Sequence, residues 1–186
     1  IGPARVPLVA PATMILLLII FMLFANQNFF NSGNLRAIWL DASIILVLGV
    51  GMTIVITARG IDLSIGAILV LSSVVMSAAI KDFGLPPLIG MALALLTGML
   101  CGLINGLLVT KLRMPDFIVT LSTELVFRGL ALIYAGGAIF FGFPEIIRFL
   151  GTGRVLDIPM PIVIGVVIAI IGHAFLAWHR FGLRLH

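Results

Sequence analysis

The sequence predicts an all-α membrane protein, a polytopic bundle of about six transmembrane helices that form one domain over residues 1–186. Of its residues 62% are hydrophobic and only 10% are charged, and the mean hydropathy is +1.31. A soluble domain normally carries about 25% charged residues. The apolar runs reach the roughly 20 residues that a helix needs to cross a bilayer, and lipid offers the backbone no hydrogen-bond partners outside a helix.

The spans follow the apolar runs in order. The first is expected at about 7–25, as a retained helix rather than a signal peptide, because no small-residue cleavage site follows it. The other spans are expected at about 39–58, 63–80, 86–110, 117–135 and 159–178. Between the last two, 144-PEIIRFLG-151 predicts a short amphipathic helix on the outer surface, which starts at Pro144 and stops at Gly151.

The basic residues predict the orientation, with a cytoplasmic N-terminus. The loop 110-TKLRMP-115 is the clearest inside marker. With alternating spans, the inside segments hold Arg5, Arg59, Lys111, Arg113, Arg180 and Arg184, and the outside segments hold Arg36, Lys81, Arg148 and Arg154.

The stretch 57-TARGIDLSIG-66 interrupts two apolar runs and predicts a helix stop followed at once by a restart. Gly60 is expected to end the first helix, with Arg59 as a cation suited to the helix C-terminus. Asp62 or Ser64 is expected to cap the next helix. The pattern allows a tight hairpin at the inner surface or a deeper broken helix whose N-terminus faces a cavity.

Polar residues inside the spans are the candidates for a solute path, because such residues are costly in lipid and face the bundle interior or a cavity. Glu124 and Arg128 are four residues apart with the acid first, so they are expected to pair on one helix face. Asn105 is expected either to bond between helices or to contact solute. The path or helix-break candidates are Asp62, Ser64, Asn105, Thr120, Ser122, Thr123, Glu124 and Arg128.

Small residues recur every four positions in the fourth expected span, at Gly90, Ala94, Gly98, Gly102 and Gly106. This spacing forms a groove that another helix can approach closely, so the span is placed in the bundle interior. It serves either static packing or movement of neighbouring helices.

The chain carries none of the common catalytic, nucleotide or metal motifs, neither GxxxxGK[ST] nor HExxH nor GxSxG. No metal site or cofactor is therefore expected on it. The 11 basic and 7 acidic residues are thinly spread, which gives nucleic-acid binding no support.

The motif 58-ARGIDLSIG-66 resembles the GGIDLSVGS-type signature of the sugar permeases of bacterial ABC importers, which include ribose, other simple-sugar and autoinducer-2 permeases. The segment 102-GLINGLLVTKLRMPDFIVTLSTELVFRGLALIYAGG-137 resembles the second block of that family, and 149–164 and 181–186 resemble later ones. The likeness covers about residues 40–186. Arg59 stands where glycine is common, and Ser122 and Glu124 stand where small or apolar residues are usual.

The resemblance implies a permease subunit in the bacterial inner membrane. A second permease subunit, identical or a sister chain, would complete the pathway, a cytoplasmic ABC ATPase would bind ATP and Mg²⁺, and a periplasmic sugar-binding protein would deliver the solute. Membrane lipid surrounds such a protein. The family's chains continue well beyond residue 186, so this chain looks like an N-terminal fragment.

Two other functions are weighed. A branched-chain amino-acid ABC permease would have a similar span pattern, but the DLSIG motif favours sugar. A membrane enzyme needs a nucleophile with a base or paired acids, and Asp62, Glu124 and His173 have no clear partners for that.

Overall fold

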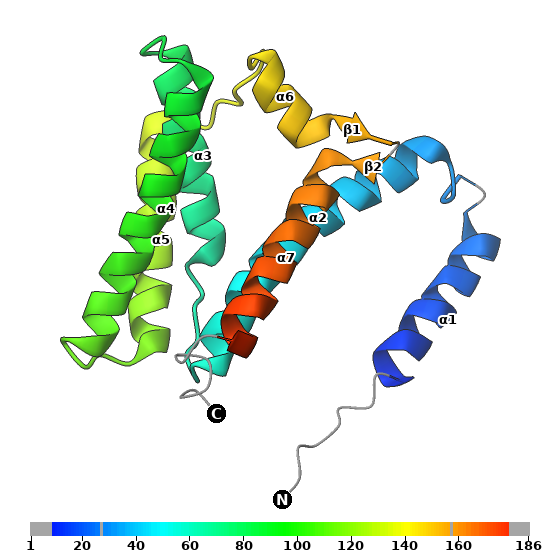
Figure 1. Ribbon diagram of the computed structural model, residues 1–186, viewed down its shortest axis with the longest axis horizontal. Helices are drawn as coiled ribbons and strands as arrows, with labels where there is room; N and C mark the ends of the chain where they lie inside the picture. Colours follow the sequence, from blue (N-terminus) through cyan, green and yellow to red (C-terminus); the bar gives the residue numbers. More distant parts are fainter. Residues whose placement is uncertain (1–8, 27, 157, 179–186) are drawn as a thin grey trace, which may run out of the picture.

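The computed structural model describes residues 9–26, 28–156 and 158–178, which are mostly helical (Figure 1). The predicted all-α bundle is confirmed. In chain order the elements are α1 (Val9–Ala25), α2 (Ser32–Thr57), α3 (Ile65–Lys81), α4 (Pro87–Thr110), α5 (Asp116–Ala135), α6 (Glu145–Thr152), β1 (Arg154–Val155), β2 (Ile158–Pro159) and α7 (Met160–Trp178). Arg5, Arg180, Arg184 and the start of the first expected span lie outside the described residues.

Each expected span coincides with a helix, and four of these helices, α2, α4, α5 and α7, are long and apolar enough to cross a membrane. Helices α1 and α3 have 17 residues each, which corresponds to about 26 Å at 1.5 Å per residue, somewhat less than the roughly 30 Å hydrocarbon layer. That all six helices cross remains a prediction.

Helix α2 begins seven residues before its expected span, at Ser32 rather than at about 39. Asn31 caps it, because its side-chain oxygen accepts the Gly33 N–H at 3.0 Å. The first turns are polar, so a search for apolar runs does not find them, although the backbone is already helical there.

The helices pack in two units. Helix α3 packs on α4 and α5, and α2 packs on α7. Figure 1 shows the two units leaning apart, with α1 separate from both, and no described residue of α1 is buried.

Glycines set the close contacts within both units. A Cβ at Gly90 of α4 would lie 2.7 Å from the Ile80 side chain of α3. On α7, a Cβ at Gly165 would lie 2.9 Å from Leu46, and one at Gly172 would lie 2.6 Å from Val50, both on α2. The α7 pair is seven residues apart and shares one helix face. The analysis of small-residue spacing had found only the α4 series.

The short amphipathic helix predicted at 144–151 is confirmed as α6, although it includes Gly151 and has Gly153 as its C-cap residue. Its place on the outer surface remains a prediction. The antiparallel β1–β2 pair that follows it was not predicted; Arg154 lies opposite Pro159. The Arg36 guanidinium donates to the Thr152 carbonyl at 3.0 Å and so ties the end of α6 to α2.

The connections between helices gather at two opposite ends of the bundle. At one end, the Ile61 N–H of the α2–α3 connection donates to Asp116, next to the α4–α5 loop. At the other end, Lys81 donates to the Gly142 carbonyl at 2.6 Å and Tyr134 donates to Asp82 at 2.8 Å. Which end is cytoplasmic remains a prediction.

Candidate functional site: the interrupted helix

Helix α2 ends in a Schellman motif in which Arg59, and not Gly60, takes the left-handed conformation. Arg59 has φ 61°. Its N–H donates to the Ile56 carbonyl at 2.9 Å, and the Gly60 N–H donates to the Val55 carbonyl at 3.0 Å. The expectation that Gly60 ends the helix was therefore wrong by one residue. The two hydrogen bonds of the Schellman motif place the positive φ at Arg59, although glycine would adopt this conformation at lower cost.

Helix α3 restarts inside the bundle rather than at its end. Ile61 lies level with Asp116, the first residue of α5, whereas Ser64 contacts Asn105, five residues before the end of α4 at Thr110. Five residues of helix rise about 7.5 Å. Figure 1 shows α3 starting short of the neighbouring ends of α4 and α5. The turn thus lies at the bundle end, and 61–64 climbs inward to a recessed helix start.

A chain of polar contacts joins this recessed start to α4. Asp62 Oδ1 accepts the Ser64 N–H at 2.8 Å and the Ser64 hydroxyl at 2.6 Å. The Asn105 amide nitrogen donates to the Ser64 hydroxyl oxygen at 2.7 Å. Ser64 is fully buried and Asn105 is 6% exposed. The sequence analysis named all three residues, and the structure brings them together.

The capping prediction for α3 was only partly right. Ser64 holds the N-cap position, but its side chain makes no capping bond to the first turn of α3. Its hydroxyl oxygen accepts the Asn105 amide N–H instead, and its hydroxyl proton goes to Asp62 Oδ1. Asp62 therefore shapes the turn before α3 rather than capping the helix itself.

Helix α5 holds the other side of the interruption. Asp116 Oδ2 accepts the Ile61 N–H at 2.6 Å, and its Oδ1 accepts the Phe117 N–H at 2.8 Å. The buried Thr120 hydroxyl lies 3.3 Å from the Ile61 carbonyl and 2.9 Å from that of Asp116. Sequence reasoning missed Asp116, although an acidic residue directly after Pro115 at a helix start is a recognisable signal.

The remaining polar candidates on α5 divide between the interior and the surface. Thr123 is buried and its hydroxyl lies 3.3 Å from the Thr120 carbonyl. Ser122 is exposed and donates to the Ile118 carbonyl of its own helix. The Glu124–Arg128 pair is formed, with 2.6 Å between Oε1 and Nε, and the Arg128 side chain is 59% exposed. A path role for these residues remains a prediction.

The α4 small residues face two different environments. Gly90 is buried against Ile80, a Cβ at Gly98 would lie 3.6 Å from the Ser72 hydroxyl, and Ala94 lines a groove along α3. A Cβ at Gly102 or Gly106 would meet no described atom within 4 Å. The first three therefore lie against α3, whereas Gly102 and Gly106 are exposed and no described residue packs on them, so the expected interior position holds for only part of the series.

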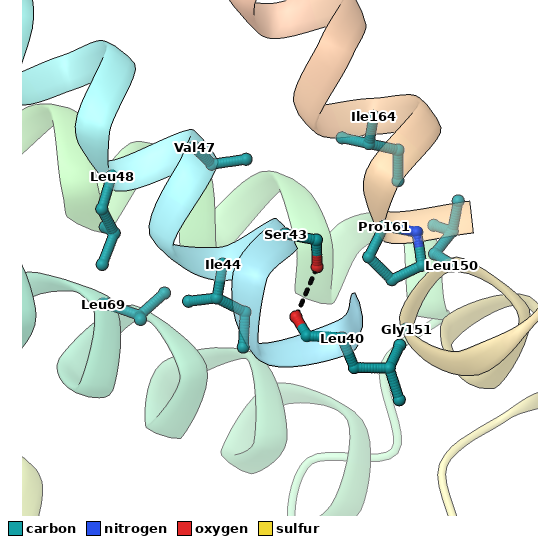
Figure 2. Close-up of a pocket in the computed structure, with 10 residues that line it drawn as sticks. All are labelled: Leu40, Ser43, Ile44, Val47, Leu48, Leu69, Leu150, Gly151, Pro161 and Ile164. Carbon is teal, nitrogen blue, oxygen red and sulfur yellow. Dashed lines mark hydrogen bonds between the residues drawn. The ribbon is translucent and has the colours of Figure 1, made fainter. Parts of the chain in front are cut away.

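A cavity of about 300 Å³ lies between α2, α3, α6 and α7 (Figure 2). Its walls are almost wholly apolar side chains such as Leu40, Val47 and Leu69. The hydroxyl of Ser43 is already committed to the Leu40 carbonyl at 2.6 Å. A hydrophilic solute finds few partners here, in contrast to the interrupted helix with its buried Ser64 and Asn105.

The fold and the site together define a polytopic membrane protein whose buried polar groups gather at a broken helix, an arrangement typical of transporters. The chain belongs to the family described as "Branched-chain amino acid transport system / permease component", whose sequence profile matches residues 34–186. No solved structure matches the chain.

Similar proteins of known name are import permeases. The fructose import permease protein of Rhizobium meliloti is 42% identical over 120 residues, which make up 64% of this chain and 32% of that protein. The ribose import permease protein of Bacillus subtilis is 36% identical over 178 residues, 95% of this chain and 55% of the relative. The autoinducer 2 import system permease protein of Yersinia enterocolitica is 39% identical over 142 residues, which make up 73% of this chain and 39% of that protein. The chain thus spans between about a third and just over half of these relatives.

Proposed function

We propose that the full-length protein is the permease subunit of an ATP-driven importer of a simple sugar. The observation that carries the proposal is the similarity to permeases named for ribose, fructose and autoinducer 2. The family description names branched-chain amino acids, but none of these three relatives does.

The chemistry of the interrupted helix supports a neutral, hydroxylated solute. Its buried side chains, Ser64, Asn105 and Thr120, are uncharged hydrogen-bonding groups. A zwitterionic amino acid would need a buried counter-charge for its ammonium group, because an isolated charge is very costly away from water. The charges near this site, on Asp62 and Asp116, already accept backbone or hydroxyl protons.

The importer is proposed to lie in the bacterial inner membrane with the N-terminus of this chain in the cytoplasm. A second permease subunit, a cytoplasmic ABC ATPase that binds ATP and Mg²⁺, and a periplasmic sugar-binding protein complete the complex. This chain supplies walls of the pathway and no catalytic group.

The test is uptake by the full-length permease, reconstituted into liposomes with its ATPase and binding protein. ATP-dependent accumulation of radiolabelled ribose or fructose, with none of leucine, is expected. Accumulation of leucine alone would establish the amino-acid alternative and refute the proposal.

A further inference from the structure

Asn105 carries a buried oxygen that has no partner among the described residues, and this oxygen lies in the polar cluster of the interrupted helix. The amide oxygen Oδ1 is buried and accepts no hydrogen bond, although a buried polar atom without a partner costs about 1–3 kcal/mol. The Asn105 side chain as a whole is 6% exposed.

The orientation of the amide follows from the hydrogen-bond chain. An ionised carboxylate only accepts, so the Ser64 hydroxyl proton points to Asp62 Oδ1 at 2.6 Å. The Ser64 oxygen must then accept from its other neighbour, which requires the NH₂ group of Asn105 on that side. Exchanging the amide N and O would place two acceptors face to face, so Oδ1 remains the atom that lacks a partner.

The described hydroxyls around the cluster are already committed. Ser64 donates to Asp62, Thr120 donates to the Asp116 carbonyl at 2.9 Å, and Thr123 points to the Thr120 carbonyl. One turn along α4, the same face carries Cys101, which belongs to an apolar cluster with Ala67 and Phe127. The donor for Oδ1 must therefore come from a bound molecule or from another part of the protein.

The recessed start of α3 specifies the chemistry of that donor. The first-turn N–H groups of a helix need acceptors, and no side chain caps them here. The positive end of the helix dipole also disfavours a cation or an ammonium group. A hydroxyl satisfies both needs, because it donates its proton to Oδ1 and accepts an N–H with its lone pairs.

We propose that Asn105 and the first turn of α3 form a binding site for one hydroxyl group, supplied by an ordered water molecule or by the transported solute. Asn105 Oδ1 accepts the hydroxyl proton, and the Asn105–Ser64–Asp62 chain holds the amide in place. The solute source rests on the proposed sugar transport, whereas the water source does not.

The experiment uses the full-length permease with its ATPase and binding protein in liposomes, and it compares Asn105→Leu with Thr97→Val. Thr97 lies on the same helix, and its hydroxyl donates to the Leu93 carbonyl of its own turn at 2.8 Å, so Thr97→Val is expected to leave uptake within twofold. Asn105→Leu is expected to lower the melting temperature and to reduce ribose uptake about tenfold, the scale of one buried hydrogen bond.

Ribose and its deoxy analogues then separate the two sources. An equal loss with every analogue assigns the hydroxyl to bound water. If the loss disappears for a single analogue, the bound hydroxyl is the solute hydroxyl that this analogue lacks. If Asn105→Leu melts at or above the wild-type temperature and transports ribose within twofold of wild type, the site does not exist.

Asn105→Ala, which is smaller and carries no hydrogen-bonding group, replaces the leucine variant if that variant does not assemble, and it is judged by the same outcomes. If the wild-type protein takes up neither ribose nor fructose, the proposed function fails. Measured in a Ser64→Ala background, where the Asn105–Ser64 bond is already absent, the melting comparison still tests the hydroxyl site, because it requires no solute.

Discussion

At the scale of single residues, Arg59 explains how this chain departs from the motif it resembles. The family commonly has glycine at this position, and here the position requires φ 61°. An L-residue in the left-handed region is strained by about 1–2 kcal/mol relative to its usual conformations. The glycine of the motif therefore suits the positive φ of the Schellman turn, and Arg59 adopts the same φ with conformational strain.

Arg59→Gly is expected to stabilise the protein by about 1 kcal/mol, because glycine adopts positive φ without strain. The measurement is the melting temperature of the full-length permease in detergent. Lys111→Gly is the matched control, since Lys111 follows α4 with φ −85°. Glycine relieves no backbone strain at this φ and only increases the conformational entropy lost on folding. An equal shift in both variants would contradict the argument from φ.

Asp62→Ala is expected to lower uptake and stability, because it removes the acceptor for both the Ser64 N–H and the buried Ser64 hydroxyl. Leaving these donors without a partner costs about 1–3 kcal/mol. Asp62→Asn keeps an acceptor oxygen, so it should retain most of the stability. Uptake and melting temperature are measured together; wild-type values for Asp62→Ala would show that the turn does not depend on this carboxylate.

At the scale of elements, α3 is short because the segment 61–64 before it is not helical. Residues 61–64 lead from the level of Asp116 to that of Asn105, so the helix begins only at Ile65. The recessed start leaves an uncapped helix end next to Asn105. The recessed start of α3 therefore accounts both for the short length of this helix and for the proposed hydroxyl site.

Helix α4 offers a test that separates packing within the chain from assembly with another subunit. Gly90→Leu is expected to destabilise the chain itself by about 1–3 kcal/mol, because even a Cβ there lies 2.7 Å from Ile80. A Cβ at Gly102 meets no described atom within 4 Å, so the expected effect of Gly102→Leu is on assembly, because the larger side chain blocks the approach of a neighbouring helix.

Melting temperature reports the first effect, and size-exclusion chromatography of the full-length complex reports the second. A complex of wild-type size and activity with Gly102→Leu would show that no helix packs on this face. Normal melting of Gly90→Leu would show that α3 and α4 are not in close contact.

At the scale of the whole molecule, the two ends of the bundle make a prediction about orientation. Arg113 lies in the α4–α5 loop at one end, and Phe141 lies in the α5–α6 connection at the other; both are exposed. In intact cells, a membrane-impermeant maleimide is expected to label Phe141→Cys and not Arg113→Cys. Native Cys101 is buried and gives little background. The reverse pattern would place the N-terminus outside.

The two-unit arrangement also relates structure to the proposed transport. The buried side chains of Ser64, Asn105 and Thr120, which bond between elements, lie where the interruption contacts α4 and α5, whereas the cavity between the units is apolar. A path for a sugar that involves this chain is therefore expected to begin at the interruption and to run along the α4–α5 side.

The helices could be predicted well from the sequence because a segment in lipid must be long enough to cross and must satisfy its own backbone hydrogen bonds. Both requirements apply within one apolar run. It missed the polar first turns of α2, which have no apolar signal, and the glycine contacts of α7 with Leu46 and Val50, which depend on a partner helix. It named Asp62, Ser64 and Asn105 as separate candidates but had no means of joining residues 41 positions apart.

The sequence by itself determined that this protein is a helical membrane bundle with one polar interruption, because composition and periodicity act within a single helix. Only the tertiary structure decided that Asp116 accepts the Ile61 N–H and that Asn105 has a buried oxygen without a partner among the described residues. These features depend on which helix ends meet and at what level. Hydrogen bonds have short range and strict direction, so neighbours distant in sequence settle them.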